Sequence, residues 1–519
     1  MELIQKTIRY NQEGKKTFDQ FYLDEDYNVP DAKQDVRRII KGQGTVKIED
    51  VKLVENYVRI SGKLYFQILY VTDQGEPMPA VLDGKIPFEE MVYTEGEERT
   101  QYFVRNIRVE FGTTLVHSRK ISIRAMIEME VGCETLIEEE TAVDLESSAS
   151  IYKKQKPVNL LKLHTAKKDT YRIKEQLTIS GTKESIGNIL WKEVLSRRLD
   201  TRLEADTLKL QGELLVFCLY ESVDGKTDWI CENVPYEGQV ECFGAEEGMY
   251  HQIYPILTDA LLEPAMDEDG EMRLLGIEAT LSMRFFLCTE EKIQILDDLY
   301  SLKTCCVPAY TQCKVENVLM QNHSKCKIAE RLSLPEIKDD ILQICYSDAR
   351  IQVEQMTVQD TGIQIEGVLH IRFMYVRPDD QIPFALWQGM IPFSWLLESN
   401  EVQEDMTLDM MPSLEQLGIS LLGNGEIEVK AVLAFRSFLR GKVTFRNIDS
   451  VEEKEIDYKV LEQRPGIIGY IVKEGDELWN LAKYYGTTKE GIMDINHMES
   501  EQLKCGDKLL IFKENASIL

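Results

Sequence analysis

The sequence predicts a mainly β protein, in which three tandem repeated β-rich domains, sandwich- or barrel-like, are followed by a small βααβ domain. Three observations lead to this prediction. Apolar and polar residues alternate with a period of two over long stretches. Segments within the first 450 residues recur at fixed spacing. From Tyr470 to Phe512 the apolar spacing becomes helical instead.

The clearest repeat relates residues 30–93 to residues 335–398 without a gap, at a constant offset of 305. Matching residues include Pro30, Asp35, Glu49, Gly62, Leu64, Tyr70 and Val71, which recur as Pro335, Asp340, Glu354, Gly367, Leu369, Tyr375 and Val376. The run Gly84–Phe88 also recurs as Gly389–Phe393. A register kept over this length is not a chance match, so the two segments are copies of one unit.

A third copy lies between these two. In it, Gly212, Leu214 and Tyr220 take the places of Gly62, Leu64 and Tyr70, and a later strand shares Ala125, Ala279 and Ala431 among the copies. We therefore place the β-rich domains at 20–150, 165–305 and 322–450. An N-terminal segment at 1–19 precedes them, and a linker at 451–467 leads to the last domain at 468–513.

The pattern inside each copy indicates strands that bury one face. From Val58 to Tyr70 every second residue is apolar, and the same alternation returns from Leu208 to Tyr220 and from Ile363 to Tyr375. Such strands belong to a sandwich or a barrel. The glycine in the middle of each strand predicts a bulge or bend. The Pro-Phe or Pro-Tyr pair that follows predicts an edge position and a core aromatic.

The C-terminal domain shows the punctuation of two short helices between two strands. Asp476 is placed to cap a first helix, whose buried face we expect to consist of Leu478, Leu481, Ala482 and Tyr485. Gly486 suits the left-handed residue that ends this helix. Thr487 with Glu490 three residues later predicts a capping box for a second helix, with Ile492 and Ile495 on its apolar face. Lys508–Ile511 is expected to be the closing strand.

This domain resembles the LysM family. The resemblance rests on Tyr470, Val472, Gly475, Asp476, Leu478, Trp479, Ala482, Gly486, Thr487, Asn496, Leu503, Gly506, Leu509 and Ile511, in the order of the family. It implies a groove for N-acetylglucosamine-containing glycans, formed here by Gly475, Asp476, Glu477, Leu478 and Asn496. Two residues depart from the family pattern, because Glu477 replaces a threonine and Phe512 replaces a proline. Several acidic residues also lie near this groove.

The three repeats followed by such a domain resemble the SPOCS domain proteins, which are clostridial spore coat morphogenetic proteins. The resemblance implies a protein of the mother-cell cytoplasm that acts at the outer surface of the forespore membrane. It also implies a partner, the ATPase of the coat basement layer (stage IV sporulation protein A), bound through the LysM domain. Candidate contacts are Trp479, Tyr484, Ile492, Met493, His497 and Met498, of which we favour Tyr484 and Met493 because they lie off the apolar stripe.

Charge and cysteine content limit the other functions. The formal net charge of −29 argues against binding to nucleic acid or directly to an anionic membrane. The first residues lack the apolar core of a secretory signal, and no apolar stretch is long enough to span a bilayer, so we expect a cytosolic protein. Eleven cysteines, an odd number, favour reduced thiols. The alternative function is binding to peptidoglycan or cortex glycan through the LysM domain.

The sequence offers no constellation for catalysis and predicts no cofactor. It lacks a phosphate-binding glycine loop and a nucleophile elbow, and its six histidines are scattered. One cluster remains to be explained, formed by Cys305, Cys306, Cys313 and Cys326. Its spacing does not fit the paired ligands of a structural zinc site. Structural zinc, redox pairing and ordinary thiols all stay open for these residues.

Overall fold

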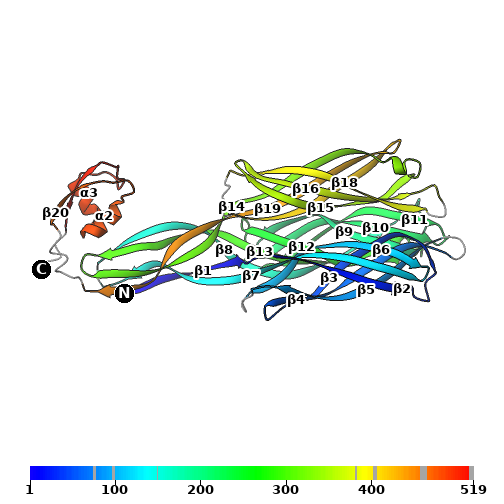
Figure 1. The fold of residues 1–519 in the computed structure, drawn as a ribbon, viewed down its shortest axis with the longest axis horizontal. Coiled ribbons are helices and arrows are strands. Elements are labelled where there is room, and N and C mark those ends of the chain that lie inside the picture. Colours follow the sequence, from blue (N-terminus) through cyan, green and yellow to red (C-terminus); the bar gives the residue numbers. More distant parts are fainter. Residues whose placement is uncertain are drawn as a thin grey trace.

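The computed structural model describes residues 1–73, 78–95, 100–148, 150–379, 383–400, 406–455 and 465–513. The molecule is elongated, with a broad body of strands, a narrower stalk of strands, and a small helical domain at the far end of the stalk (Figure 1). Nearly all described elements are strands, and the two α-helices lie in the C-terminal domain. The predicted mainly β class is therefore confirmed.

Each repeated unit contains two antiparallel sheets, which are three-stranded except that β1 adds a fourth strand to one sheet of unit 1. Unit 1 pairs β3-β4-β5 in one sheet and β2-β7-β6 in the other, and units 2 and 3 repeat this order. The strands of unit 1 are β2 (Thr17–Asn28), β3 (Val36–Val54), β4 (Tyr57–Thr72), β5 (Pro79–Tyr93), β6 (Gln101–His117) and β7 (Lys120–Glu146). Those of unit 2 are β8 (Ile151–Thr178), β9 (Ile186–Glu204), β10 (Thr207–Ser222), β11 (Thr227–Glu241), β12 (Tyr250–Ala265) and β13 (Leu274–Ser301). Unit 3 contains β14 (Cys305–Ser333), a 3₁₀ turn η1 (Pro335–Ile337), β15 (Gln343–Gln359), β16 (Gly362–Val376), β17 (Phe384–Glu398), β18 (Thr407–Gly423) and β19 (Glu426–Lys454).

The repeated glycine marks the place where an aromatic ring crosses the central strand of each unit. A Cβ on Gly62, Gly212 or Gly367 would lie 2.8, 2.6 or 2.8 Å from the ring of Phe88, Tyr236 or Phe393, respectively. The neighbouring strand shifts register beside each glycine, so the predicted bulge is present. The prolines before these rings lie on edge strands, and the rings are buried, as predicted.

The stalk consists of the ends of long strands from all three units. β1 (Glu2–Glu13) pairs with the end of β7, the first half of β8 pairs with the end of β13, and the first half of β14 pairs with the end of β19. These three hairpin-like arms pack on one another through Ile8, Val158, Ile295, Val315 and Phe445. At about 3.3 Å per residue, the 12 residues of β1 extend the stalk by roughly 40 Å.

The stalk places strand residues outside the segments that the repeat pattern delimited. Residues 1–19, taken as a separate N-terminal segment, form β1 and the start of β2, and both strands pair with β7. β8 begins at Ile151 and β14 at Cys305, ahead of residues 165 and 322. The linker at 451–467 begins inside β19 and ends at β20, and residues 456–464 lie outside the described part of the chain.

The three units meet around one position that is equivalent in all of them. Lys41, Trp191 and Tyr346 occupy the same place in the repeat, each opposite Leu69, Leu219 or Met374 on the next strand. The Lys41 Nζ lies 4.8 Å from the Trp191 ring centroid and 5.1 Å from that of Tyr346. Apolar residues from all three units surround this contact. The chain therefore forms one body around a pseudo-threefold centre.

Buried charges complete this centre. Glu193 accepts hydrogen bonds from Lys41, Tyr346 and Trp191, and the Arg372 guanidinium lies 3.3 Å from Glu193 and 3.2 Å from Asp348. Burial raises the pKa of Glu193, but Lys41 and Arg372 outweigh that effect and hold its pKa below the ordinary value. The centre thus contains a fully ionised carboxylate whose partners come from three different units.

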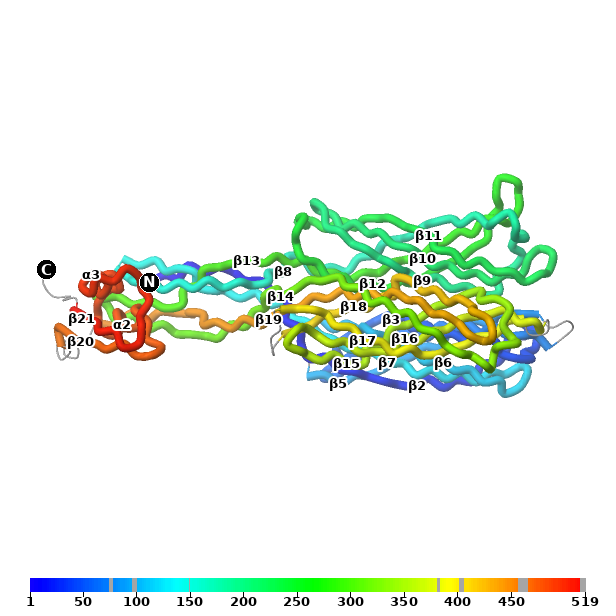
Figure 2. The backbone as a smooth tube through the Cα atoms, turned by 90° about the horizontal axis from the view of Figure 1, so that it is seen from above, coloured from blue at the N-terminus to red at the C-terminus, as the bar shows by residue number. Residues whose placement is uncertain are grey.

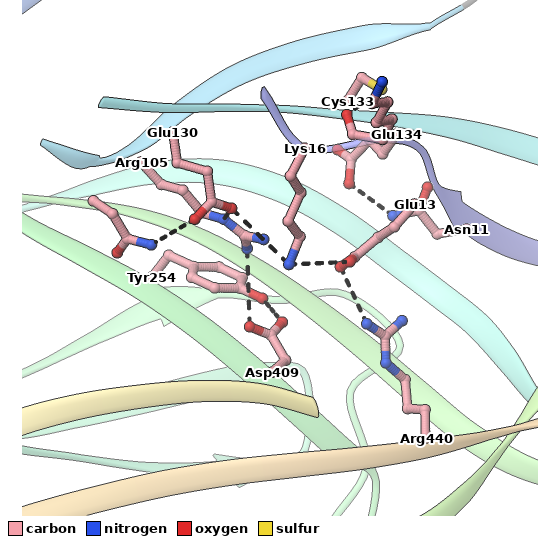
Figure 3. A network of polar contacts seen from close by, with 12 residues as sticks. Asn11, Glu13, Lys16, Arg105, Glu130, Cys133, Glu134, Tyr254, Asp409 and Arg440 are labelled. Atoms are coloured by element: carbon pink, nitrogen blue, oxygen red, sulfur yellow. Dashed lines mark hydrogen bonds and ion pairs between the residues drawn. The ribbon is translucent and has the colours of Figure 1, made fainter. Parts of the chain in front are cut away.

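A second polar network joins the units where the stalk meets the body (Figure 3). Arg105 contacts Glu130 at 2.7 Å and Asp409 at 3.8 Å, and the Tyr254 hydroxyl donates to Asp409. Arg440 contacts Glu13 at 3.1 Å and Glu316 at 2.7 Å. Burial and the neighbouring Asp409 raise the pKa of Tyr254 well above its ordinary value, so its hydroxyl remains a donor.

Candidate interaction site on the C-terminal domain

The C-terminal domain has the predicted βααβ order. It consists of β20 (Ile467–Ile471), α2 (Leu478–Tyr485), α3 (Lys489–Ile495) and β21 (Lys508–Phe512), and the two strands pair antiparallel. Its core contains Leu478, Leu481, Ala482 and Ile492. Gly486 ends α2 in the left-handed conformation, at φ 68°, as predicted.

The caps of both helices differ from the prediction. Residue Glu477 stands at the N-cap of α2 without a side-chain hydrogen bond. The Asp476 carboxylate instead accepts from the backbone N–H of Lys473 and from the Tyr470 hydroxyl, each at 2.7 Å, and so closes the preceding loop. The cap of α3 is Thr488, whose hydroxyl accepts from the backbone N–H of Gly491 at 2.9 Å, in place of Thr487. Both predicted caps were wrong by one residue.

The residues of the predicted glycan groove are engaged within the protein. Leu478 is buried, and Gly475 has a positive φ of 85° in the loop. Glu477 is ion-paired with Lys154 of the stalk. The Asn496 amide donates to the carbonyls of Ile492 and Leu510, and its oxygen accepts from the backbone N–H of Leu510 at 2.7 Å. These contacts tie the second helix to β21, so Asn496 has a structural role in the described chain.

One face of α2 lies against the end of the stalk. The Trp479 indole donates to Asp298 at 2.8 Å, and Lys483, one helical turn later, donates to the same carboxylate at 2.6 Å. The Trp479 ring lies 4.9 Å from the ring of Tyr300, and Tyr300 in turn stacks on Tyr152. Trp479 is 6% exposed, so this docking surface already covers a residue that we expected to contact a partner.

Asp298 is the centre of this docking surface. Besides Trp479 and Lys483, the Tyr310 hydroxyl donates to Asp298 at 3.0 Å. Close by, the Tyr300 hydroxyl donates to the backbone carbonyl of Thr487 at 3.0 Å. Burial raises the pKa of Asp298, but the bonds from Lys483 and Trp479 outweigh it and hold the pKa below the ordinary value. The docked state therefore favours the ionised form of Asp298.

We expect docking to be independent of pH through the neutral range and to be lost in acid. Because the Asp298 pKa is depressed in the docked state, its contribution is present above the ordinary Asp value of about 3.9 and disappears as the pH falls through the lower docked value. The extent of docking at each pH is measured by the fluorescence of Trp479, taken as the difference between the protein and its Trp479→Phe variant. Far-UV circular dichroism reports global unfolding separately. A loss of docking near pH 6 would contradict the assignment to Asp298.

The other predicted contacts differ in their exposure and fall into three groups. Tyr484 is 63% exposed at the end of α2, and His497 is exposed after α3 with a positive φ of 52°. Met493 and Met498 are half-buried and pack against the core of the domain. Ile492 is 0% exposed, so its expected role as a direct contact is wrong. Tyr484 is thus the most exposed aromatic or apolar side chain among the predicted contacts, and its ring packs edge-on against that of Tyr485.

Sequence reasoning missed two features of this site. The first is the set of stalk residues that hold α2, namely Asp298, Tyr300 and Lys154, which carry no motif of their own. The second is the outer face of the two-stranded sheet, where Ile467, Ile471 and Leu510 are exposed. The sequence of β21 is a continuous apolar run from Leu509 to Phe512, so it does not tell which of the two faces of the strand is covered.

The cysteine cluster does not form a site. All four residues lie on β14, where Cys306, Cys313 and Cys326 are spread along roughly 65 Å of one strand. Cys313 and Cys326 are buried, and the Cys313 thiol donates to Glu139. Within the described ranges, no group of three His, Cys, Asp or Glu side chains is arranged to hold a metal ion.

Comparison with protein families agrees with both parts of this architecture. The family model described as SipL, SPOCS domain matches residues 35–113 and 340–422, and the LysM domain model matches residues 470–512. No curated protein and no solved structure matches the chain. In the part of the chain that is described, no helix is long and apolar enough to cross a membrane.

The two family matches lie in units 1 and 3 and in the βααβ domain. Unit 2 has no match, yet its strands pair in the same order as those of the other two units. Both families are binding or scaffold types without a catalytic role of their own. Together they indicate a spore-coat-associated protein with a LysM binding module. The chain has the make-up of a SipL-like protein, in which SPOCS domains are combined with a LysM domain.

Proposed function

We propose that the protein is a non-enzymatic scaffold for spore coat assembly, which binds the basement-layer ATPase, stage IV sporulation protein A, through its LysM domain. It acts in the mother cell, at the outer surface of the forespore membrane, where it helps to place coat around the forespore. The combination of SPOCS and LysM domains supports this proposal. A protein that presents a binding module at the end of a stalk is suited to link one layer to another.

The observation that carries the proposal is the distribution of free surface on the LysM domain. Asp476, Glu477 and Asn496 of its groove are bonded within the protein, and Trp479 is covered by the stalk. Tyr484 remains exposed beside this docking surface, where an aromatic side chain can be buried by a protein partner. Aromatic residues are enriched among the side chains that dominate interface energies. We therefore assign the partner contact to the face that contains Tyr484, His497, Met493 and Met498.

Replacing Tyr484 by alanine is expected to weaken binding to the coat ATPase by about tenfold or more, as loss of an interface aromatic does. Co-purification of the full chain with the ATPase, followed by titration, measures the change. Tyr22→Ala is the matched control, because Tyr22 is exposed to a similar extent on β2, far from the LysM domain. A chain without residues 466–519 lacks the LysM domain and shows how much ATPase binding remains when LysM-dependent binding is lost completely.

The alternative ligand is tested with the same proteins. Peptidoglycan is expected to sediment no more of the full chain than of the chain without the LysM domain. Normal ATPase binding by a folded Tyr484→Ala chain would refute the proposed face. Strong, LysM-dependent sedimentation with peptidoglycan, without ATPase binding, would refute the proposed partner.

A further inference from the structure

Units 1 and 2 enclose a large cleft. One wall consists of residues from β3, β4, β5 and β6 of unit 1, and the other consists of residues from β8, β9, β12 and β13 of unit 2. Seen from above, β9–β11 of unit 2 lie along one side of the body and β3 and β5 of unit 1 lie toward the other (Figure 2). The cleft has a volume of about 1500 Å³, and Lys47 bridges its walls by an ion pair with Asp259 at 2.6 Å.

The repeat alone does not explain why this cleft is open, because an ion pair bridges the equivalent interface between units 2 and 3. Between units 2 and 3, Arg436 of β19 reaches across to Asp200 of β9, at 3.8 Å. The equivalent residues here are Arg284 and Asp50, which both line the cleft. They do not meet, because Arg284 pairs with Glu134 and Asp50 pairs with Lys52. The contact that closes one interface is thus replaced at the other by an Arg284–Glu134 pair, which joins unit 2 to β7 of unit 1, and by an Asp50–Lys52 pair within β3.

The cleft is positive in its unpaired charges, although the chain as a whole carries −29. Each lining carboxylate except Asp83 has an ion-pair partner; these are Glu49, Asp50, Asp169, Glu193 and Asp259. Among the described residues, Lys85, Lys168 and Lys192 of the lining have no such partner. Lys85 and Lys168 are exposed and stand on opposite walls. Three free lysines against one free carboxylate favour an acidic ligand.

The size of the cleft and the uncharged residues of its lining favour a polypeptide as the ligand. Pockets for small ligands measure about 300–1,000 Å³, and this cleft is larger. Its lining follows β3 from Gln43 to Val51, which spans about 26 Å, the reach of roughly eight residues of extended chain. Tyr65 and Ile256 are exposed apolar contacts on the two walls. Thr45, Thr170 and Gln67 supply polar groups for main-chain hydrogen bonds.

We propose that the cleft between units 1 and 2 binds an extended, acidic segment of a partner polypeptide. The acidic side chains of the segment pair with Lys85 and Lys168, and its apolar side chains pack on Tyr65 and Ile256. This surface is separate from the LysM domain, so the two sites can hold different partners at once.

The test uses the full chain and a fluorescein-labelled peptide of about eight residues that alternates glutamate and leucine, followed by anisotropy. The combined Lys85→Glu and Lys168→Glu change is expected to raise Kd by about tenfold or more, because each reversal sets like charges together. Ile256→Asp is expected to act in the same direction. A peptide in which glutamine replaces glutamate is expected to bind about tenfold more weakly to the unchanged protein.

Lys327→Glu is the matched control, since Lys327 is an exposed lysine on β14 of unit 3, outside the cleft. An unchanged Kd for this control supports the proposal, whereas an equal loss would show that only overall charge matters. Unchanged binding by the double reversal would overturn the proposal. Competition by inorganic phosphate, at the concentrations that displace the peptide itself, would also overturn it, because the ligand would then be a small anion. Sedimentation velocity of the unliganded chain is expected to give a monomer, and a dimer dispersed by Lys168→Glu would assign the cleft to a second copy instead.

Discussion

Replacing Glu193 by alanine is expected to lower the free energy of unfolding by about 3–5 kcal/mol, the range found when one partner of a buried ion pair is removed. The substitution leaves Lys41 buried without its carboxylate, and it leaves the half-buried Arg372 with Asp348 as its remaining ion-pair partner. It also removes the acceptor for the Tyr346 hydroxyl and the Trp191 indole. Chemical denaturation monitored by circular dichroism measures the change.

Glu213→Ala is the control for this prediction. Glu213 forms a partly exposed pair with Arg198, at 2.8 Å, so its loss is expected to cost less than about 1 kcal/mol. The stabilising effect of Glu193 is present above its unfolded pKa and is lost as the pH falls through its depressed folded pKa. Equal stability of the two variants would show that the centre tolerates unpaired cations, and would contradict the role given to Glu193.

Replacing Asp298 by alanine is expected to release the LysM domain from the stalk. Hydrogen bonds to charged groups contribute about 1.5–3 kcal/mol each, so the loss of the bonds to Lys483 and Trp479 shifts the docking equilibrium by about two to four orders of magnitude. We expect Trp479 to become accessible to acrylamide and α2 to exchange amide hydrogens faster. The LysM domain keeps its own core and remains folded.

Asp144→Ala provides the comparison for the docking experiment. Asp144 is a stalk carboxylate paired with Lys153 at 2.6 Å, and it makes no contact with the LysM domain. Its loss is expected to leave Trp479 protected. If Asp298→Ala also left Trp479 protected, the ring contact with Tyr300 would be sufficient for docking, and the carboxylate would be dispensable.

Much of the fold follows from local patterns in the sequence. The alternation in β4, β10 and β16 predicted their buried faces. The glycine and the Pro-Phe pair predicted a bulge or bend at Gly62 and a core position for Phe88, and the structure brings these two residues into contact. The βααβ order of the C-terminal domain was predicted, because Gly486 and the apolar stripe of α2 are short-range signals, but Ile495, expected on the apolar face of α3, is 38% exposed. The cap of α3 was missed by one residue because Thr487 and Thr488 are equivalent in sequence. The cap of α2 was missed because Asp476 bonds to the preceding loop and not to the helix.

The contacts between units and between domains were not predictable in this way. One repeat position holds Lys41, Trp191 and Tyr346, and in an alignment this difference indicates only that the copies have diverged. In the structure the three side chains contact one another, so their difference has a structural reason. Trp479 gave a sound signal for packing, but nothing in sequence connects it to Asp298, which lies far away along the chain. The arms of the stalk were missed because their cores form only when three units are brought together.

The arrangement of the stalk determines when, during synthesis, its three arms can pack together. Ile8 and Phe445 share one apolar cluster, although Ile8 lies in β1 and Phe445 lies in β19, which is made only after the 18 strands before it. At roughly 5–20 residues per second, Ile8 waits about 20–90 seconds for Phe445. During that interval the arm of β1 and β7 is an exposed apolar hairpin. The stalk is therefore closed as one of the last steps of folding, and a ribosome that stalls within unit 3 leaves that arm open to other chains.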